Sequence, residues 1–149
     1  MTVPRRYWDD IEVGEAYESP GRTVTEADIV LFAGLSGDYN VLHTDAEFMK
    51  GSIFGERIAH GLLGLSIQSG LLTRAMAPYA TIAFGGLRWK FKAPIKIGDT
   101  IRVRARVVTK QETKTDRGLV TLERTVVNQR GEVVQQGETD LIVERRPLA

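Results

Sequence analysis

The sequence predicts an α+β fold in which a curved antiparallel β-sheet wraps around a long central α-helix. Residues His60 to Met76 are almost all apolar at helical spacing, which indicates a buried helix. The last third of the chain changes to a two-residue alternation of apolar and charged side chains, which is typical of strands with one buried face. Short turn signals separate these strands, so neighbouring strands are expected to run antiparallel.

The composition is that of one folded domain, and we expect residues 1–149 to form it. The chain has 42% hydrophobic and 26% charged residues, and its net charge of +1 gives no electrostatic reason to expect a nucleic-acid or membrane-surface binder. Cysteine is absent, which excludes disulfides, thiolate nucleophiles and zinc–thiolate clusters. Because neither a secretion signal nor a long apolar run is found, we expect a cytoplasmic protein.

The first 24 residues mix aromatic residues with Gly14 and Pro20, which indicates an extended arm and a first strand from Ala16 to Val24. Thr25 with Asp28 three positions later is typical of a capping box, so a helix should begin there. Glycines from Gly34 to Gly37 are expected to end this helix.

The central helix is predicted from His60 to Met76, after one or two helical turns at Asp45 to Lys50 and a loop at Gly51 to Arg57. Its apolar side chains surround most of the helix, so we expect burial on several sides. Three glycines cost helix stability, about 1 kcal/mol each relative to alanine, and should serve close backbone approach. They are Gly61, Gly64 and Gly70. Pro78 follows the helix and prevents its continuation.

Four strands should follow the helix. The first carries Leu87, Trp89 and Phe91 in alternation with basic residues. The others are predicted at Thr100 to Gln111, Leu119 to Asn128 and Glu132 to Glu144, with turns at residues 116–118 and 128–131 between them. A helix wrapped by such a sheet is the hotdog fold. One such layer leaves an edge strand and part of the helix uncovered, so we expect a homodimer or a higher oligomer of dimers.

The segment SGDYNVLH places Asp38, Asn40 and His43 within six residues, in a stretch too rich in Gly, Asp and Asn for the interior of a helix or strand. We therefore expect an ordered loop that carries a carboxylate, an amide and an imidazole. Taken alone, Asp38 would be a turn residue and His43 a structural histidine. Their combination with a helix that begins at His60 and Gly61 favours a catalytic site.

The segments SGDYNVLHTDAEF, AHGLLGLS and FKAPIKIGD resemble the MaoC-like dehydratase family, which includes the (R)-specific enoyl-CoA hydratases. The resemblance extends from about Tyr7 to Glu144. One departure is visible, because Val41 stands where the family usually has proline. The resemblance implies reversible addition of water to the double bond of a 2-enoyl-CoA thioester, which is equally the dehydration of a 3-hydroxyacyl-CoA.

Hydration of such a thioester needs a base for water, an acid for the α-carbon and donors for the enolate oxygen. Asp38 and His43 supply the first two, and the resemblance implies the same roles. Asn40 does not titrate and would orient the water or the loop. The free amide of Gly61 at the helix start is the candidate donor. Ser66 matches a family serine near the catalytic pair, and we assign it a supporting role.

Other residues receive weaker or structural interpretations. His60 should fix the entry of the helix. A metal site built from Asp38, His43, Asp45 and His60 is disfavoured because no ligand pair has fixed helical spacing. Neither a metal nor a redox cofactor is expected, since coenzyme A enters as part of the substrate. Candidates for binding its phosphates are Arg88, Lys90 and Lys92. Candidates for the acyl tunnel are Phe32, Leu35, Ile53, Phe54 and Phe84.

Two other functions remain open at this stage. A hotdog acyl-CoA thioesterase would use the carboxylate and water to cleave the thioester itself. A non-catalytic acyl-CoA-binding module would keep the fold without turnover. The position of His43 five residues after Asp38 favours hydration over thioester cleavage, and the presence of Asp38, Asn40 and His43 together disfavours a non-catalytic module.

Overall fold

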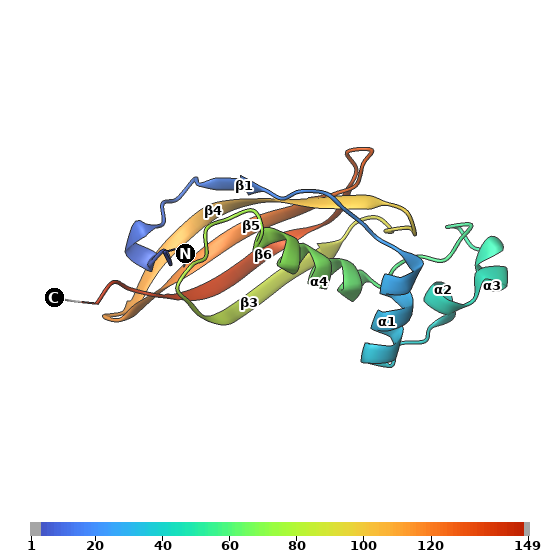
Figure 1. Cartoon of the computed structure of the whole chain (residues 1–149), viewed down its shortest axis with the longest axis horizontal. Helices are drawn as coiled ribbons and strands as arrows, with labels where there is room; N and C mark the ends of the chain where they lie inside the picture. The colour runs from blue at the N-terminus through green and yellow to red at the C-terminus, as the bar shows by residue number, and fades with distance from the viewer. Residues whose placement is uncertain (1–3, 148–149) are drawn as a thin grey trace.

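The computed structural model describes residues 4–147, in which one antiparallel sheet packs against helix α4. The strand order is β1-β4-β5-β6-β3, and β2 also pairs with β4. Figure 1 shows α4 against one face of the sheet, with α1, α2 and α3 grouped beyond one end of it. The elements are a 3-10 helix at Trp8–Asp10, β1 Ala16–Glu18, β2 Arg22–Thr23, α1 Glu26–Ser36, α2 Val41–Thr44, α3 Ala46–Lys50, α4 Gly61–Leu72, β3 Thr81–Phe91, β4 Thr100–Lys114, β5 Arg117–Val127 and β6 Val133–Glu144.

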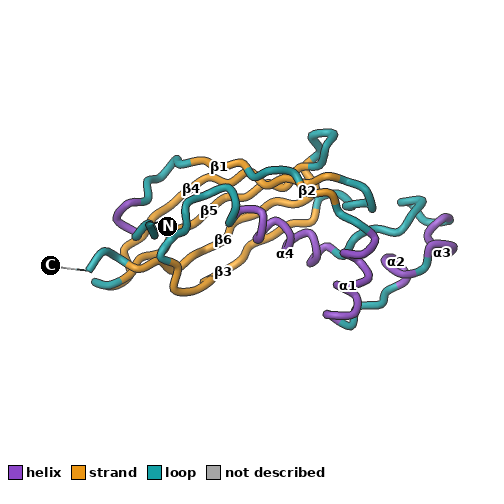
Figure 2. Tube along the Cα trace, viewed as in Figure 1, coloured by secondary structure: helices purple, strands orange, loops and turns teal. Residues whose placement is uncertain are grey.

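This arrangement confirms the predicted α+β hotdog fold. Figure 2 shows the long strands side by side, with β1 and β3 at the two margins of the sheet. The alternation predicted for β4 is also confirmed, because Val103 and Val107 are buried whereas Arg102 and Arg104 are exposed. Within residues 4–147, no helix combines the length and the apolar character needed to cross a bilayer.

Helix α1 begins and ends where its local signals indicate. The Thr25 side chain accepts a hydrogen bond from the Asp28 N–H, and the Asp28 side chain accepts one from the Thr25 N–H, so the capping box is complete. Gly37 ends the helix with φ of 76°, a left-handed conformation that glycine adopts without steric cost. The sequence therefore located this helix correctly.

The first predicted strand is interrupted, which corrects its expected extent of Ala16 to Val24. β1 ends at Glu18 and β2 begins at Arg22. Between them, the Ser19 side chain accepts a hydrogen bond from the Val103 N–H at 3.0 Å, and the proline that follows has no N–H to donate. A side chain thus replaces one rung of the backbone ladder.

Helix α4 ends at Leu72 rather than Met76, and it is buried along one face instead of on several sides. The buried residues are Leu63, Gly64, Ile67, Gln68, Leu71 and Leu72. A Cβ on Gly61 would lie 2.8 Å from Phe91 Cδ1 and one on Gly64 would lie 2.6 Å from Ile95 Cδ1, so both glycines permit close packing. Gly70 faces open space, which contradicts the same expectation for that residue.

Strand β3 starts earlier than its alternation indicated, at Thr81, and its predicted apolar face is buried only in part. Leu87 and Phe91 are 42% and 54% exposed, whereas Trp89 packs against the core. Within residues 4–147, β3 pairs with β6 alone and forms one margin of the sheet. The sequence predicted the strand periodicity of β3 correctly, but it did not predict which segments cover its apolar face.

Candidate active site

His43 lies on a short helix rather than in the loop that the composition predicted. The Asn40 side chain accepts a hydrogen bond from the Leu42 N–H at 3.1 Å and begins α2 at Val41. Of the two roles expected for Asn40, the structure therefore shows the second, since this amide holds the backbone that carries His43. The Asn40 side chain is exposed.

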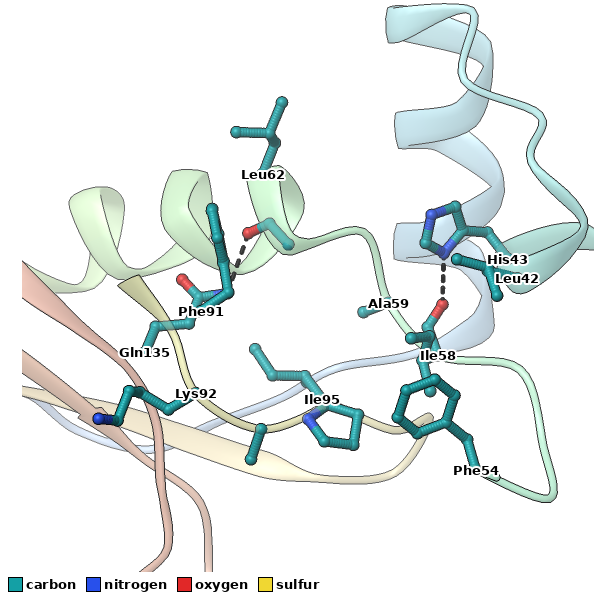
Figure 3. A pocket seen from close by; sticks show the side chains of 13 residues that line it. Leu42, His43, Phe54, Ile58, Ala59, Leu62, Phe91, Lys92, Ile95 and Gln135 are labelled. Carbon is teal, nitrogen blue, oxygen red and sulfur yellow. Dashed lines mark hydrogen bonds between the residues drawn. The ribbon is translucent and has the colours of Figure 1, made fainter. Parts of the chain in front are cut away.

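The His43 ring is buried and its orientation is set by the backbone. Its Nδ1 lies 2.7 Å from the carbonyl oxygen of Ile58 (Figure 3). Because a carbonyl oxygen only accepts, Nδ1 carries the proton of the neutral ring and Nε2 keeps a lone pair. That lone pair is available on the side of the ring that faces Asp38.

Asp38 supplies a carboxylate beside this nitrogen. Its Oδ2 lies 4.0 Å from His43 Nε2, and its Oδ1 accepts a hydrogen bond from the Asn40 N–H at 3.2 Å. The first distance is too long for a direct hydrogen bond and suits a bridging water. The Asp38 side chain is 52% exposed, whereas that of His43 is 9% exposed, so the pair spans the boundary between solvent and interior.

His60 packs against His43 and contacts Asp38. The two imidazole rings are stacked with centroids 3.7 Å apart and planes at 26°. His60 Nε2 lies 2.9 Å from the Asp38 carbonyl oxygen. His60 also directly precedes α4, as its predicted structural role requires.

A cavity of about 520 Å³ opens beside His43. Its walls include His43, Phe54, Gly61, Phe91, Lys92 and Gln135, several of which are drawn in Figure 3. The amides of Gly61 and Leu62 precede the first bond of α4, which Leu63 donates to the His60 carbonyl, so they have no acceptor within the helix. The cavity therefore combines an imidazole with free amides at the positive end of a helix.

Comparisons with known proteins show the family to which this chain belongs. A family model described as MaoC like domain matches residues 10–129. An (R)-specific enoyl-CoA hydratase from Rhodospirillum rubrum is 38% identical over 141 residues, which are 94% of this chain and 93% of that protein. The chain belongs to the MaoC-like domain family.

Further matches extend this finding. Protein MaoC of Klebsiella aerogenes is 43% identical over 100 residues, which are 67% of the MaoC-like chain but 30% of that longer protein. An X-ray structure described as a monoamine oxidase regulatory protein from Archaeoglobus fulgius has a TM-score of 0.93 at 40% identity. The match covers 99% of this chain and 100% of that chain.

Ser66 is not brought to Asp38 and His43 within the single MaoC-like chain. Its hydroxyl donates to the Leu62 carbonyl at 2.8 Å, one turn earlier in α4, and the residue is exposed. It is not among the residues that line the cavity. The hydroxyl is therefore already engaged in a hydrogen bond within its own helix, which is a local structural role.

The three predicted basic residues do not lie together, because Lys92 is separated from Arg88 and Lys90. Arg88 donates to Glu138 and to Asp140, each at 2.9 Å, so the guanidinium is already paired. Lys90 has the same strand parity as Arg88 and therefore lies on the same outward face of β3. Only Lys92 lines the cavity of the MaoC-like chain.

Asp38, His43 and His60 each offer a ligand atom, and these atoms lie within 4.8 Å of one another. Stacked rings at 26° hold their lone pairs in nearly parallel planes, whereas a tetrahedral or octahedral metal needs them to converge. The Asp45 carboxylate instead accepts from the Phe48 N–H at 2.9 Å, where it caps α3. The geometry of the described residues therefore does not favour a metal.

The predicted acyl-tunnel residues are mostly elsewhere. Phe54 lines the cavity, and Phe32 packs edge-on against the His60 ring at 5.0 Å. In contrast, Leu35 and Ile53 are 84% and 94% exposed. Phe84 is also largely exposed, on β3.

Sequence reasoning missed Gln135, which borders the cavity. Its amide donates to the Gly61 carbonyl at 2.9 Å and accepts from the Trp89 indole at 3.0 Å. The available signal was a polar residue at an inward position of β6, in register with Phe91. Such a side chain needs buried partners, which here are the first residue of α4 and β3.

Proposed function

We propose that this MaoC-like chain is a hydro-lyase that adds water reversibly to the double bond of a 2-enoyl-CoA thioester. The observation that supports it is the Asp38–His43 pair, separated by 4.0 Å, beside a cavity that also contains the free Gly61 amide. The (R)-configuration of the 3-hydroxyacyl product is proposed from the name of the Rhodospirillum rubrum relative.

The proposed chemistry uses Asp38 and His43 as one acid–base pair. A water between them loses a proton to one of the two groups, and its oxygen adds to the β-carbon of the substrate. The pair then returns one proton to the α-carbon, so the overall reaction adds one water and both groups end in their starting protonation states. The lone pair on His43 Nε2 makes this histidine competent to accept a proton.

The thioester carbonyl gains negative charge as the β-carbon is attacked. In the proposed complex, the Gly61 N–H donates to this oxygen at the start of α4, where the helix dipole favours an anion. A donor in such a position typically lowers the barrier by about 2.7–4 kcal/mol. Asn40 acts indirectly, through the turn that carries His43.

Coenzyme A is proposed to enter as part of the substrate, and the reaction itself needs no metal or redox cofactor. Lys92 is the proposed phosphate contact, because it lines the cavity. We do not propose Arg88 as a phosphate contact, because its guanidinium is already ion-paired. Lys90 is not proposed either, because it does not line this cavity. Cytoplasmic location stays a prediction.

We also propose a homodimer formed through β3. This margin strand exposes Ile82 at 43%, Phe84 at 53% and Phe91 at 54%, and its outer backbone edge has no neighbouring strand within residues 4–147. A second copy would cover these side chains and pair the edge. The molar mass in solution tests this, with Phe84→Glu as the disrupting variant and the exposed Glu47→Ala as control.

The activity is tested with crotonyl-CoA and with longer and branched enoyl-CoAs, monitored by loss of enoyl absorbance. Wild type should hydrate at least one of them, and Asp38→Ala and His43→Ala should lose about 10²- to 10⁴-fold in rate. Glu47→Ala, an exposed carboxylate on α3 paired with Lys50, should keep the wild-type rate. Equal rates in all four proteins would contradict the site. Steady thiol release without loss of enoyl absorbance would instead indicate a thioesterase.

A further inference from the structure

We propose that His60 is a positioning residue for this reaction, because one side chain determines how the Asp38 carboxylate and the His43 imidazole face each other. The inference rests on the proposed function and goes beyond the structural role expected from the sequence. His60 contacts Asp38 through a hydrogen bond and His43 through ring stacking. It also directly precedes Gly61, the proposed thioester donor.

The hydrogen bond identifies the form of the ring. The Asp38 carbonyl oxygen only accepts, so His60 Nε2 donates and carries the proton of the neutral imidazole. His60 Nδ1 is buried and has no hydrogen-bond partner within residues 4–147. A proton on Nδ1 would create a buried donor without an acceptor, which is unfavourable. The observed bonding therefore suits a ring that acts as a fixed hydrogen-bond donor to the Asp38 backbone.

His60 provides the distant anchor of the carboxylate segment. Residues 34–41 are all exposed, and the other bonds of Asp38 are local ones of 3.2 Å to Ser36 and Asn40. The bond from His60 is shorter, at 2.9 Å, and crosses 22 positions of sequence to the start of α4. Without it, the Asp38 backbone would be held only by its own neighbours.

The ring stack fixes the other half of the pair. His43 is held on one edge by the Ile58 carbonyl and on one face by His60, whose own ring packs edge-on against Phe32 at 5.0 Å. When His43 accepts a proton from water, the neutral aromatic face of His60 is a favourable neighbour for the cation. His60 is 2% exposed, so solvent does not take part in this contact.

Two variants separate the hydrogen bond from the ring. His60→Phe keeps an aromatic ring and loses the donor, whereas His60→Gln loses the ring and keeps an N–H donor of similar reach. We expect His60→Phe to lose about 10²-fold in kcat, the usual effect of misplacing a catalytic group by about 1 Å, with KM close to the wild-type value. His60→Gln should recover part of this kcat because it restores the anchor.

A second measurement does not depend on turnover. Hydrogen exchange of the amides of residues 38–40 should become faster in His60→Phe and stay near wild type in His60→Gln. In addition, the double variant His60→Phe/Asp38→Ala should be no slower than Asp38→Ala, because a residue that acts through Asp38 has no effect once the carboxylate is gone. Circular dichroism of each variant establishes that it is folded.

The outcomes are distinguishable. Wild-type kcat in His60→Phe, parallel changes in kcat and KM, or additive losses in the double variant would each overturn the positioning role while leaving the proposed hydratase intact. If wild type hydrates no enoyl-CoA, the proposed function fails, and the catalytic part of this inference fails with it. Unchanged amide exchange in His60→Phe would overturn the anchor itself.

Discussion

Two polar clusters lie near opposite ends of the molecule and differ in how completely their groups are bonded (Figure 1). The N-terminal clamp consists of Arg6, Glu15, Tyr17 and Tyr79. Arg6 donates to both Glu15 carboxylate oxygens, at 2.7 and 2.6 Å, and the two tyrosine hydroxyls are 3.0 Å apart. The hydrogen bond from Arg6 lowers the pKa of Glu15 to about 2.

The histidine cluster of Asp38, His43 and His60 also contains a carboxylate, but its polar groups are less completely bonded among the described residues. Its carboxylate and imidazole are 4.0 Å apart, and His60 Nδ1 has no partner within residues 4–147. A carboxylate with close donors stabilises the fold, whereas a carboxylate and a lone pair that face a gap remain available to a water. Incomplete bonding beside a cavity therefore distinguishes the candidate active site from the clamp.

The largest expected effect is on the rate of hydration, which should depend on the Asp38 carboxylate and not on that of Glu15. Asp38→Asn keeps the size of the side chain but cannot accept a proton, so the rate of hydration should fall about 10²- to 10⁴-fold. Its free energy of unfolding should change by less than about 0.5 kcal/mol, because the carboxylate is largely exposed. Parallel kinetics and urea unfolding measure both. A destabilised but active Asp38→Asn would reverse the comparison.

In the clamp, substitution of the carboxylate should lower stability and leave the rate of hydration unchanged. Glu15→Gln removes the charge that pairs with Arg6, so the free energy of unfolding should fall by about 2 kcal/mol, while kcat stays near wild type. The folded-state pKa of Glu15 is lowered by Arg6 from 4.5 to about 2, so its contribution is complete above pH 4.5 and is lost as the pH falls towards 2.

Urea unfolding at pH 7 and at pH 3 checks this prediction. The difference between wild type and Glu15→Gln should shrink at the lower pH, where more of the unfolded chain carries a protonated Glu15. A constant difference across this range would show that the carboxylate contributes through its shape and not through its charge. Glu47→Gln replaces an exposed carboxylate and serves as the control for effects of low pH that do not depend on Glu15.

The smallest expected effect concerns a third buried polar group, Arg124, which resembles neither cluster. It is 3% exposed, and among residues 4–147 it donates to Gln68 alone, at 3.4 Å; burial lowers its pKa to about 10. Burial disfavours the charged guanidinium in the folded state and so lowers the free energy of unfolding. This destabilisation is complete below pH 10 and decreases only above it. Arg124→Met should therefore leave the free energy of unfolding unchanged or raise it by about 1 kcal/mol.

Thermal and urea unfolding of Arg124→Met, beside Arg6→Met, completes the comparison. Arg6→Met should destabilise, because it leaves Glu15 buried among fewer donors. If Arg124→Met lost as much stability as Arg6→Met, the Arg124 guanidinium would be well satisfied, and the contrast between bonded and unbonded charges would not hold.

Much of the candidate active site could be predicted from the sequence, because Asp38, Asn40 and His43 are neighbours in the chain. The spacing did not reveal that Asn40 acts as a helix cap, since a four-residue helix leaves almost no periodic signal. It also gave no indication that His60 bonds to Asp38, because that contact joins positions 22 residues apart. Gln135 was missed for the same reason, as its partners belong to α4 and β3.

The amino-acid order alone determined the features whose energetics act within a few residues: the capping box at Thr25, the glycine that ends α1 and the alternation along β4. Tertiary structure decided the others. The last turn expected for α4 is absent, Ser19 interrupts the first strand, and Leu87 and Phe91 on the apolar face of β3 are exposed. Periodicity states which side chains share a face, but only the packing of distant segments determines whether anything covers that face.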